Sequence, residues 1–281
     1  MILIADSGST KTSWLLQSPG LAPQSFGTSG INPFYQGKSS IVNSLTNELL
    51  PQLNGYGAPD AVYFYGAGCS QDDRIIIVID SLRQAFPNAH IEVEHDLMAA
   101  ARALCGKEAG IACILGTGSN SCLYDGVNIV DNVPSLGFII GDEGGGGYIG
   151  RKLLQSYFYR ELPDDLREMM EKRFDMERSA VLNQIYGKET PSKYVAEFAG
   201  FLTENNKHPY VHTLLYKSFM EFLTRHVLKY ENFGNLPIHF TGSIAHFNKS
   251  IILEALDNLV LKPGKFMRDP IDGLAQYHAK K

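Results

Sequence analysis

The sequence lacks any apolar run approaching the ~20 residues that a membrane-spanning helix needs. It also lacks a basic segment ahead of its first apolar residues, so we expect no signal peptide. Its four cysteines, Cys69, Cys105, Cys113 and Cys122, form no C-x-x-C pair. Buried, reduced thiols are the simplest expectation for such cysteines. We therefore predict a cytoplasmic protein without a membrane partner.

Several familiar motifs are also missing. No G-x-x-x-x-G-K-[ST] sequence occurs, which excludes a P-loop. His208 and His212 are four residues apart, but no glutamate stands where an H-E-x-x-H zinc site requires one. A G-x-S-x-G nucleophile elbow is absent too. The sequence therefore gives no support to a P-loop NTPase, a zinc protease of this type or an α/β-hydrolase.

The composition sets broad bounds on what is present. The chain has 281 residues, of which 44% are hydrophobic, so it can bury one large core or two ordinary ones. Its formal net charge of −5 argues against broad binding to nucleic acid. A small charged ligand is still compatible with this charge, because it needs only a local positive potential.

The first 17 residues have the pattern of a strand, a tight polar turn and a second strand. Apolar residues fill 2–5, and Asp6 follows them before a second apolar run at 13–16. The turn between the runs consists of Ser7, Gly8, Ser9, Thr10, Lys11 and Thr12. Its N–H groups and hydroxyls are suited to phosphate oxygens, and Asp6 to a water-bridged Mg²⁺. An ordinary hairpin with a solvent-facing turn is the alternative.

The same pattern returns about a hundred residues later. An apolar run at 111–115 precedes a turn, and an apolar strand resumes at 122–124. The turn consists of Gly116, Thr117, Gly118, Ser119, Asn120 and Ser121. We interpret the recurrence as the duplication of a domain, and two such turns facing each other would hold a nucleotide's phosphates from both sides.

The remaining chain alternates apolar runs with helical patterns. We predict further strands at 61–65, 91–94, 136–140 and 238–240. We predict helices at 39–50, 71–86, 148–161, 166–174, 177–186, 193–205, 212–231 and 244–256, and a short last helix from Asp272. Strands alternating with helices indicate a layered α/β fold.

Four polar residues follow predicted strands or lie in loops. Asp96 is placed to accept a proton from a substrate hydroxyl, although a helix N-cap is the simpler role for it. Asp142 and its neighbour Glu143 would orient a sugar hydroxyl or serve as acids at a helix start. Asn32 is either a turn residue or a partner for sugar hydroxyls. The residues alone leave these alternatives open.

Taken in order, the motifs resemble a known group of proteins. DSGSTKT at 6–12, GTGSNS at 116–121 and TGSIA at 241–245 resemble the first phosphate, second phosphate and adenosine motifs of the actin/Hsp70/sugar-kinase superfamily. GINPF at 30–34, EHDLMAA at 94–100 and LGFIIGDEGGGGYIG at 136–150 are similar to the BadF/BadG/BcrA/BcrD ATPase family, in its N-acetylglucosamine kinase branch. The resemblance covers nearly the whole chain.

The resemblance implies two ribonuclease-H-like (actin-like ATPase) lobes with a nucleotide cleft between them. The first lobe would be residues 1–112 plus 266–281, and the second residues 113–265 with a helical insertion. The implied activity is transfer of phosphate from ATP, with Mg²⁺, to the 6-hydroxyl of an amino sugar, most simply N-acetylglucosamine. A homodimer with no nucleic-acid partner is implied as well.

The resemblance also implies a role for each matching residue. Asp96 would be the catalytic base, and Asp6 would help to hold Mg²⁺. ATP would be bound by Ser7, Gly8, Ser9, Thr10, Lys11, Thr12, Gly116, Thr117, Gly118, Ser119, Asn120, Gly242, Ser243 and Ala245. The sugar would be bound by Asn32, Gly68, Thr117, Leu136, Gly137, Asp142 and Gly146.

Other functions remain open from the sequence. Kinases of this branch often carry Trp where this chain has Leu136, so glucosamine or N-acetylmuramic acid is an alternative substrate. The family's other branch consists of ATPases that activate 2-hydroxyacyl-CoA dehydratases through an iron–sulfur cluster, for which Cys105 or Cys122 would have to serve as ligands. A slow ATP-hydrolysing switch of the actin/Hsp70 kind is the third reading.

Overall fold

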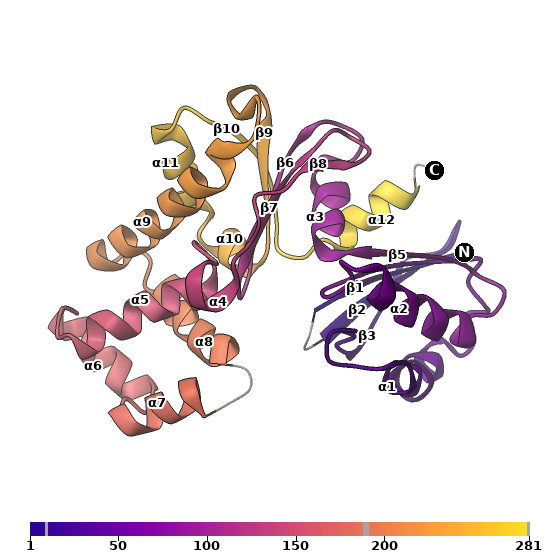
Figure 1. Cartoon of the computed structure of the whole chain (residues 1–281), viewed down its shortest axis with the longest axis horizontal. Coiled ribbons are helices and arrows are strands. Elements are labelled where there is room, and N and C mark those ends of the chain that lie inside the picture. Colours follow the sequence, from indigo (N-terminus) through magenta and orange to yellow (C-terminus); the bar gives the residue numbers. More distant parts are fainter. Residues whose placement is uncertain (9–10, 188–190, 280–281) are drawn as a thin grey trace. The chain divides into compact units, whose positions relative to one another are not determined.

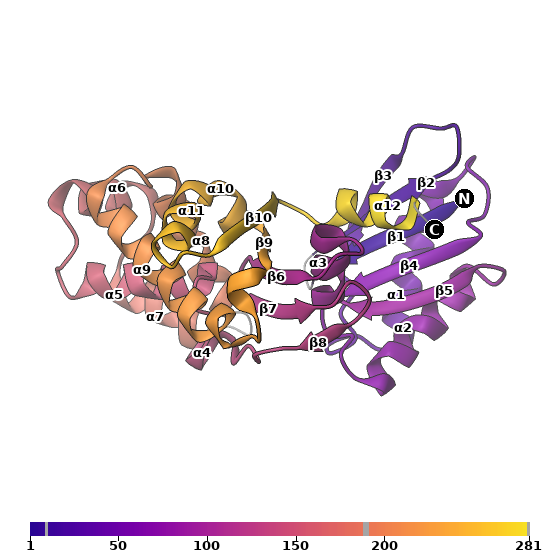
Figure 2. The same ribbon diagram turned by 90° about the horizontal axis from the view of Figure 1, so that it is seen from above.

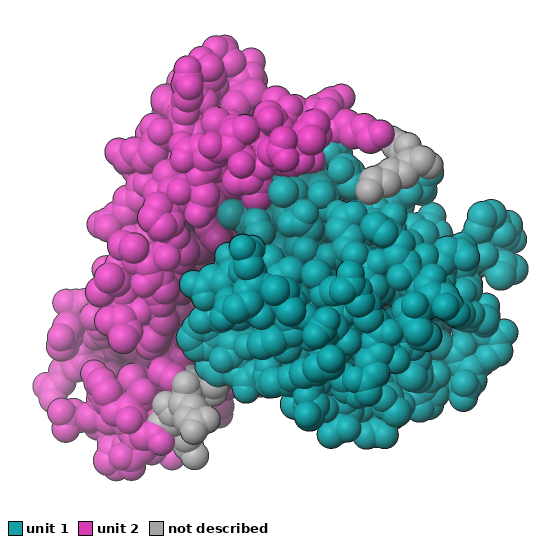
Figure 3. Space-filling model, turned by 45° about the vertical axis from the view of Figure 1, so that its right-hand side comes forward, with its two compact units in different colours: residues 1–106, 270–281 teal, residues 107–269 magenta. Residues whose placement is uncertain are grey.

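The computed structural model describes residues 1–8, 11–187 and 191–279 (Figure 1). The chain divides into two compact units, drawn in separate colours in Figure 3. Unit 1 consists of residues 1–106 and 270–281, and unit 2 of residues 107–269. Each unit holds one five-stranded mixed sheet together with helices, so the predicted α/β fold class is confirmed.

The sheet of unit 1 has the strand order β3-β2-β1-β4-β5 (Figure 2). Its strands are β1 (Ile2–Ser7), β2 (Lys11–Gln17), β3 (Gln24–Ser29), β4 (Ala61–Gly66) and β5 (His90–His95). β1, β2 and β3 pair antiparallel, whereas β4 and β5 run parallel to β1. Three parallel strands therefore end at the same edge of the sheet.

The sheet of unit 2 repeats this arrangement. Its strands are β6 (Gly110–Leu115), β7 (Ser119–Tyr124), β8 (Ile129–Asp131), β9 (Pro237–Thr241) and β10 (Lys262–Met267). Their order, β8-β7-β6-β9-β10, and their directions match β3-β2-β1-β4-β5 strand by strand. The predicted duplication is therefore present in the topology.

Helices cover the sheet of unit 1. They are α1 (Lys38–Ser44), α2 (Asp72–Ala85), α3 (Asp96–Cys105) and α12 (Ile271–Ala279). Leu3 and Ala5 of β1 share one apolar core with Ile41 of α1 and Val78 of α2. α3 and α12 pack against each other and both contact β1. The side chains of β1 alternate between the two faces of the sheet, so the strand contacts helices on both faces.

A large helical segment separates β8 from β9 in unit 2. It contains α4 (Gly137–Ile140), α5 (Gly146–Phe158), α6 (Asp164–Arg173), α7 (Arg178–Tyr186), α8 (Pro191–Glu204) and α9 (Pro209–Arg225). α10 (Ser243–Phe247) and α11 (Lys249–Asn258) follow β9. These helices pack with β6 and β9 in one apolar core. Among the described residues, no helix combines the length and apolar character needed to cross a membrane.

One predicted strand is a helix instead. The apolar run at 136–140 forms α4, and Ile139 and Ile140 are exposed rather than buried in a sheet. The guanidinium of Arg151 binds the carbonyls of Phe138, Ile139 and Gly141, which a strand would have offered to a neighbouring strand. Short apolar runs do not distinguish strand from helix by periodicity, and this prediction was wrong for that reason.

Three other predicted helices are interrupted in the structure or end earlier than predicted. The helix predicted at 39–50 is α1 followed by a π-helical turn at Leu45–Leu49 and a 3₁₀ turn at Leu50–Leu53. The helix predicted at 244–256 is broken at Asn248, whose side chain binds the Ile244 carbonyl and the Thr203 hydroxyl. The helix predicted at 212–231 ends at Arg225.

Strands β3, β8 and β10 were not predicted from the sequence. β3 and β10 are mostly exposed or half-buried, β10 contains Pro263 and Gly264, and β8 has only three residues. None of the three therefore carries the continuous apolar run by which the central strands were found.

Candidate functional site

The candidate residues of unit 1 gather at the edge where β1, β4 and β5 end. Ser7, Gly66 and His95 lie in register across these three strands. The N–H of Ala67 donates to the Ser7 carbonyl at 2.9 Å, and Asp96 follows His95 directly. The carboxyl ends of parallel strands are where open α/β sheets bind ligands. The strand order therefore brings the first turn, the Gly68 turn and Asp96 to one edge.

The first polar turn separates into buried and exposed parts. Ser7 and Thr12 are buried, and their hydroxyl oxygens lie 2.6 Å apart. The Ser7 hydroxyl also accepts the Ile31 N–H at 3.0 Å, and the Thr12 hydroxyl donates to the Ser29 carbonyl at 3.1 Å. These two hydroxyls therefore hold the turn to the β3 end of the sheet.

Gly8 and Lys11 of the same turn remain exposed, and the Gly8 N–H donates to the Lys11 carbonyl at 3.0 Å. Asp6, at the end of β1, is half-buried. Ser9 and Thr10, which we also predicted to bind ATP, lie outside the described residues. Gly8, Lys11 and Asp6 are thus the described parts of this turn that a phosphate or a metal ion can reach.

Asn32 lies in a tight turn after β3. Its side-chain Oδ1 accepts the Phe34 N–H at 2.9 Å, so the turn role considered for it is confirmed. Gly68 approaches the same side chain so closely that a Cβ there would lie 2.2 Å from Asn32 Oδ1. Gly68 also has a φ of +81°, which favours glycine. The two predicted sugar residues therefore lie against each other.

Asp96 is the first residue of α3 and not its N-cap. His95 holds the N-cap position, and its Nδ1 accepts the Met98 N–H at 3.3 Å. The capping alternative for Asp96 is therefore wrong, because its neighbour performs that role. The Asp96 side chain is exposed, although enough protein surrounds it that desolvation raises the pKa of its carboxyl. His95 and the N–H groups of residues 96 and 97 oppose this shift without cancelling it.

The second polar turn, in unit 2, is shorter than predicted. Only residues 116–118 form it, because Ser119 and Asn120 already belong to β7. The Gly116 N–H donates to the Gly118 carbonyl at 3.0 Å, and Thr117 is exposed. The Asn120 side chain instead accepts the Ser121 N–H at 2.9 Å. Thr117 is therefore the residue of this turn that remains exposed.

A glycine turn after β9 lies beside this second turn. Thr241 pairs with Ile114 in the sheet, and Gly242 follows with a φ of +107°. A Cβ on Gly242 would lie 2.3 Å from the Leu115 carbonyl oxygen. Ser243 is exposed at the start of α10, whereas Ala245 is fully buried. The predicted adenosine and phosphate motifs are therefore neighbours within unit 2.

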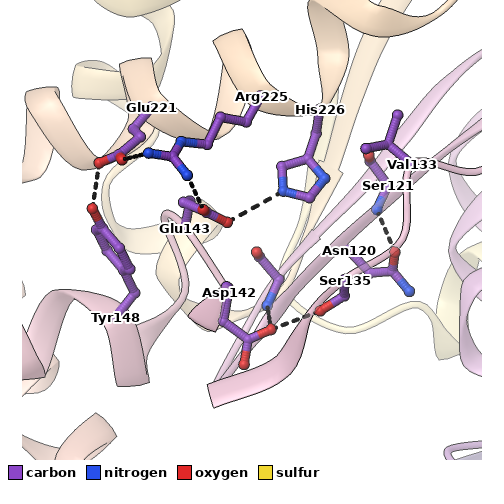
Figure 4. Close-up of polar contacts among 12 residues, drawn as sticks. Asn120, Ser121, Val133, Ser135, Asp142, Glu143, Tyr148, Glu221, Arg225 and His226 are labelled. Carbon is purple, nitrogen blue, oxygen red and sulfur yellow. Dashed lines mark hydrogen bonds and ion pairs between the residues drawn. The ribbon is translucent and has the colours of Figure 1, made fainter. Parts of the chain in front are cut away.

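Asp142 lies in a loop that binds the same turn. Its φ is +59°, and its Oδ1 accepts the Ser135 hydroxyl at 2.8 Å and the Ser119 N–H at 3.4 Å (Figure 4). At the start of α5, Gly146 and Gly147 donate their N–H groups to the carbonyls of residues 116 and 117, each at 2.8 Å. The backbone N–H of Gly146 is thus already hydrogen-bonded to the turn. Leu136 and Gly137, also predicted to contact sugar, lie at the start of α4.

Glu143 points away from Asp142 and is buried (Figure 4). Arg225 donates to its Oε1 at 3.0 Å, and His226 Nε2 lies 3.4 Å from its Oε2. α5 begins at Gly146 with Gly145 as N-cap, so the helix-start role considered for Asp142 and Glu143 is wrong. Sequence reasoning missed the partners of Glu143, because they lie more than 80 residues away and no local pattern links them.

The described residues contain no group of three or more His, Cys, Asp or Glu side chains placed to hold a metal ion. Mg²⁺ in phosphate-transferring sites is commonly held by one or two carboxylates, with phosphate and water supplying the other ligands. The single half-buried Asp6 at the end of β1 fits that donor set.

Comparisons with known proteins find relatives among solved structures. No protein-family model matches the chain, and no curated protein does. Among solved structures, the chain is 41% identical to a candidate N-acetylglucosamine kinase from Porphyromonas gingivalis, with a TM-score of 0.95 over 100% of this chain and 99% of that one. A candidate N-acetylglucosamine kinase from Chromobacterium violaceum is 18% identical, with a TM-score of 0.75 over 98% of each chain. A candidate sugar kinase from Cytophaga hutchinsonii shares the fold at 15% identity, with a TM-score of 0.57 over 100% of this chain and 99% of that one.

Proposed function

Because the chain belongs to the N-acetylglucosamine kinase-like branch of the BadF/BadG/BcrA/BcrD ATPase family, we propose that it is an ATP-dependent sugar kinase. We further propose that it transfers the γ-phosphoryl group of ATP to the 6-hydroxyl of an amino sugar, N-acetylglucosamine first. The observation that carries the proposal is the position of Asp96. It is an exposed carboxylate directly after a parallel strand, and it is not needed as a helix cap.

Asp96 is proposed as the catalytic base. A carboxylate whose pKa is raised by desolvation takes a proton from an attacking hydroxyl more effectively than an ordinary aspartate. The sugar oxygen bonds to the γ-phosphorus as the bond to the β-phosphate oxygen breaks, and the hydroxyl proton passes to the carboxylate. Such a reaction depends mostly on positioning and on neutralising charge.

The phosphates are proposed to meet Lys11 and the exposed parts of the two polar turns. These are Gly8 in unit 1 and Thr117 in unit 2. Gly242 and Ser243 are proposed to contact the adenosine, since they lie beside that turn. Mg²⁺, when bound, would neutralise phosphate charge, and Asp6 is the residue proposed to hold it through water.

The sugar is proposed to meet Asn32 and Asp142, whose polar side chains lie in the loops that follow β3 and β8. The amide of Asn32 and the carboxylate of Asp142 are groups suited to hydroxyls. The residues proposed beside them are Gly68, Leu136, Gly137 and Gly146. A homodimer remains part of the proposal.

The burial of two cysteines argues against the dehydratase-activator alternative. Cys105 and Cys122 are buried, whereas a cluster shared between two subunits needs thiolates at a surface. We therefore propose the kinase alone.

The test is ADP release from Mg·ATP across a panel of free sugars. The panel holds N-acetylglucosamine, glucosamine, N-acetylmannosamine, N-acetylmuramic acid and glucose, with 6-deoxy-N-acetylglucosamine as the control that lacks the reacting hydroxyl. We expect the highest kcat/KM with N-acetylglucosamine and no stimulation by the 6-deoxy sugar. ADP release that no sugar accelerates contradicts the kinase proposal, and equal stimulation by the 6-deoxy sugar contradicts the choice of hydroxyl.

A further inference from the structure

Two consecutive carboxylates, Asp142 and Glu143, are directed to different parts of unit 2 (Figure 4). Asp142 is half-exposed and binds Ser135 and the β7 backbone. Glu143 has a side chain only 8% exposed and is directed toward the C-terminal end of α9. The function proposed above uses Asp142 and leaves Glu143 without a role.

Glu143 is held by two cationic or potentially cationic side chains. Its Oε1 accepts from Arg225 at 3.0 Å, and its Oε2 lies 3.4 Å from Nε2 of His226. Arg225 also binds Glu221 at 2.6 Å, and Glu221 accepts the hydroxyl of Tyr148 on α5. A buried carboxylate is costly unless such partners compensate it. The network therefore fixes Glu143 to both α5 and α9.

The segment around Glu143 in turn supports the polar turn at 116–118. The N–H groups of Gly146 and Gly147 donate to the carbonyls of Gly116 and Thr117 at 2.8 Å. Asp142 accepts the Ser119 N–H just beyond the turn. The position of Glu143 is thus coupled to the position of Asp142 by one peptide unit, and its segment is coupled to the turn by the two hydrogen bonds of Gly146 and Gly147.

We propose that Glu143 is a positioning residue for the sugar site. Together with Arg225 and His226 it anchors the loop that carries Asp142, and thereby sets the affinity for the sugar. This inference rests on the proposed function, because it takes Asp142 to be a sugar ligand.

The test replaces the carboxylate while keeping its shape, in Glu143→Gln. We expect the KM for sugar to rise between about 10- and 100-fold, with a smaller fall in kcat, because misplacement of a binding group is felt at the ligand. Glu204→Gln is the matched control, since it removes the partner of Arg173 in an exposed ion pair of the same unit. The control is expected to leave both constants unchanged.

A second measurement does not depend on catalysis. Amide hydrogen exchange at Gly146 and Gly147 should be faster in Glu143→Gln than in the wild type, and unchanged in Glu204→Gln. If the wild type phosphorylates no sugar, the proposed function is wrong. Wild-type exchange rates in Glu143→Gln overturn the positioning role, whatever the activity.

The double variant Glu143→Gln with Arg225→Gln separates positioning from stability. It removes the buried anion together with its main cation, so we expect it to unfold at a higher temperature than Arg225→Gln alone, which leaves the buried carboxylate without that cation. The rise in KM for sugar should persist, because the anchor is still missing. Recovery of KM together with thermal stability overturns the proposal and makes Glu143 a structural residue only.

Discussion

The two units share one sheet topology but place different chemistry at the strand ends. In unit 1, β1 ends at Asp6 and Ser7, and β5 is followed directly by Asp96. In unit 2, β6 and β9, which take the places of β1 and β4, are followed by Gly116 and Gly242. Duplication has therefore preserved the scaffold but not the residues at equivalent strand ends. β1 ends with Asp6 and Ser7 where β6 ends with Ile114 and Leu115, and β5 is followed by Asp96 where β10 is followed by Arg268.

The connection after the third strand also differs between the units. In unit 1 the link from β3 to β4 carries Asn32 and the short α1. In unit 2 the link from β8 to β9 carries Asp142 and six helices, α4 to α9. The same topological position thus holds a proposed sugar ligand in both units. Only unit 2 adds helices that anchor the ligand-bearing loop, through Glu143.

The largest expected effect comes from the acid that unit 2 lacks. Asp96→Asn should lower kcat by about 10²- to 10⁴-fold, because it removes the proton acceptor but keeps the shape of the side chain. Nucleotide affinity, measured by calorimetry, should be nearly unchanged. Asp269→Asn, at the acid nearest the end of the equivalent strand β10, is the control and should retain wild-type kcat. A comparable fall in kcat in both variants would show that the acid after β5 is no more important for catalysis than the acid after β10.

A second effect is a loss of folding stability at low pH, which we attribute to His239 in unit 2. Burial, and to a lesser degree Lys265, lower the pKa of His239 from 6.5 to about 4. The folded state therefore binds this proton more weakly than the unfolded chain. The contribution of His239 to the free energy of unfolding is fully present above pH 6.5. It is lost as the pH falls toward 4, a loss of up to about 3 kcal/mol.

The variant His239→Asn isolates this contribution, since an asparagine can also accept the Lys265 N–H that binds the ring at 2.9 Å. Its unfolding midpoint in urea should depend less on pH between 6.5 and 4 than that of the wild type. Identical pH profiles would show that His239 is not the group responsible.

A third comparison uses one glycine from each unit. Gly68→Ala and Gly242→Ala both place a Cβ within 2.5 Å of an oxygen at positive φ, a strain of about 1–3 kcal/mol. We expect Gly68→Ala to raise the KM for sugar about tenfold and Gly242→Ala to raise the KM for ATP similarly. The same KM rising in both variants would contradict the division of roles between the two turns.

The smallest effect is a gain in stability. The folded state raises the pKa of Asp96, so the ionised carboxylate disfavours folding, and stability falls as pH rises through that pKa. Asp96→Asn removes this dependence. Its melting temperature at pH 8 should equal or exceed that of the wild type, with the difference shrinking at lower pH. A clearly lower melting temperature at pH 8 would instead indicate a structural role for Asp96.

The sequence was most informative where apolar runs are continuous. The central strands β1, β4, β6 and β9 were found because their buried residues are consecutive, and the duplication followed from their polar turns. Edge strands such as β8 and β10 were missed, because pairing with the sheet decides their structure more than composition does.

The candidate site shows the same limit. Asp96 was found from its place after a strand, but the anchoring of Glu143 depends on Arg225 and His226, which only tertiary structure brings near. In the same way, the sequence of a hydroxyl-rich turn does not show which hydroxyls form internal hydrogen bonds, as those of Ser7 and Thr12 do, and which face the solvent. Patterns along the chain locate a polar group, and packing decides which of its atoms a ligand can reach.

The most direct test follows the phosphorus atom itself. Phosphorus-31 NMR of the wild-type chain with Mg·ATP and N-acetylglucosamine should show a sugar phosphate monoester growing in step with ADP, and Asp96→Asn should show neither signal growing. Inorganic phosphate accumulating while the sugar stays unmodified would contradict the account, because ATP would then be cleaved without transfer to an alcohol.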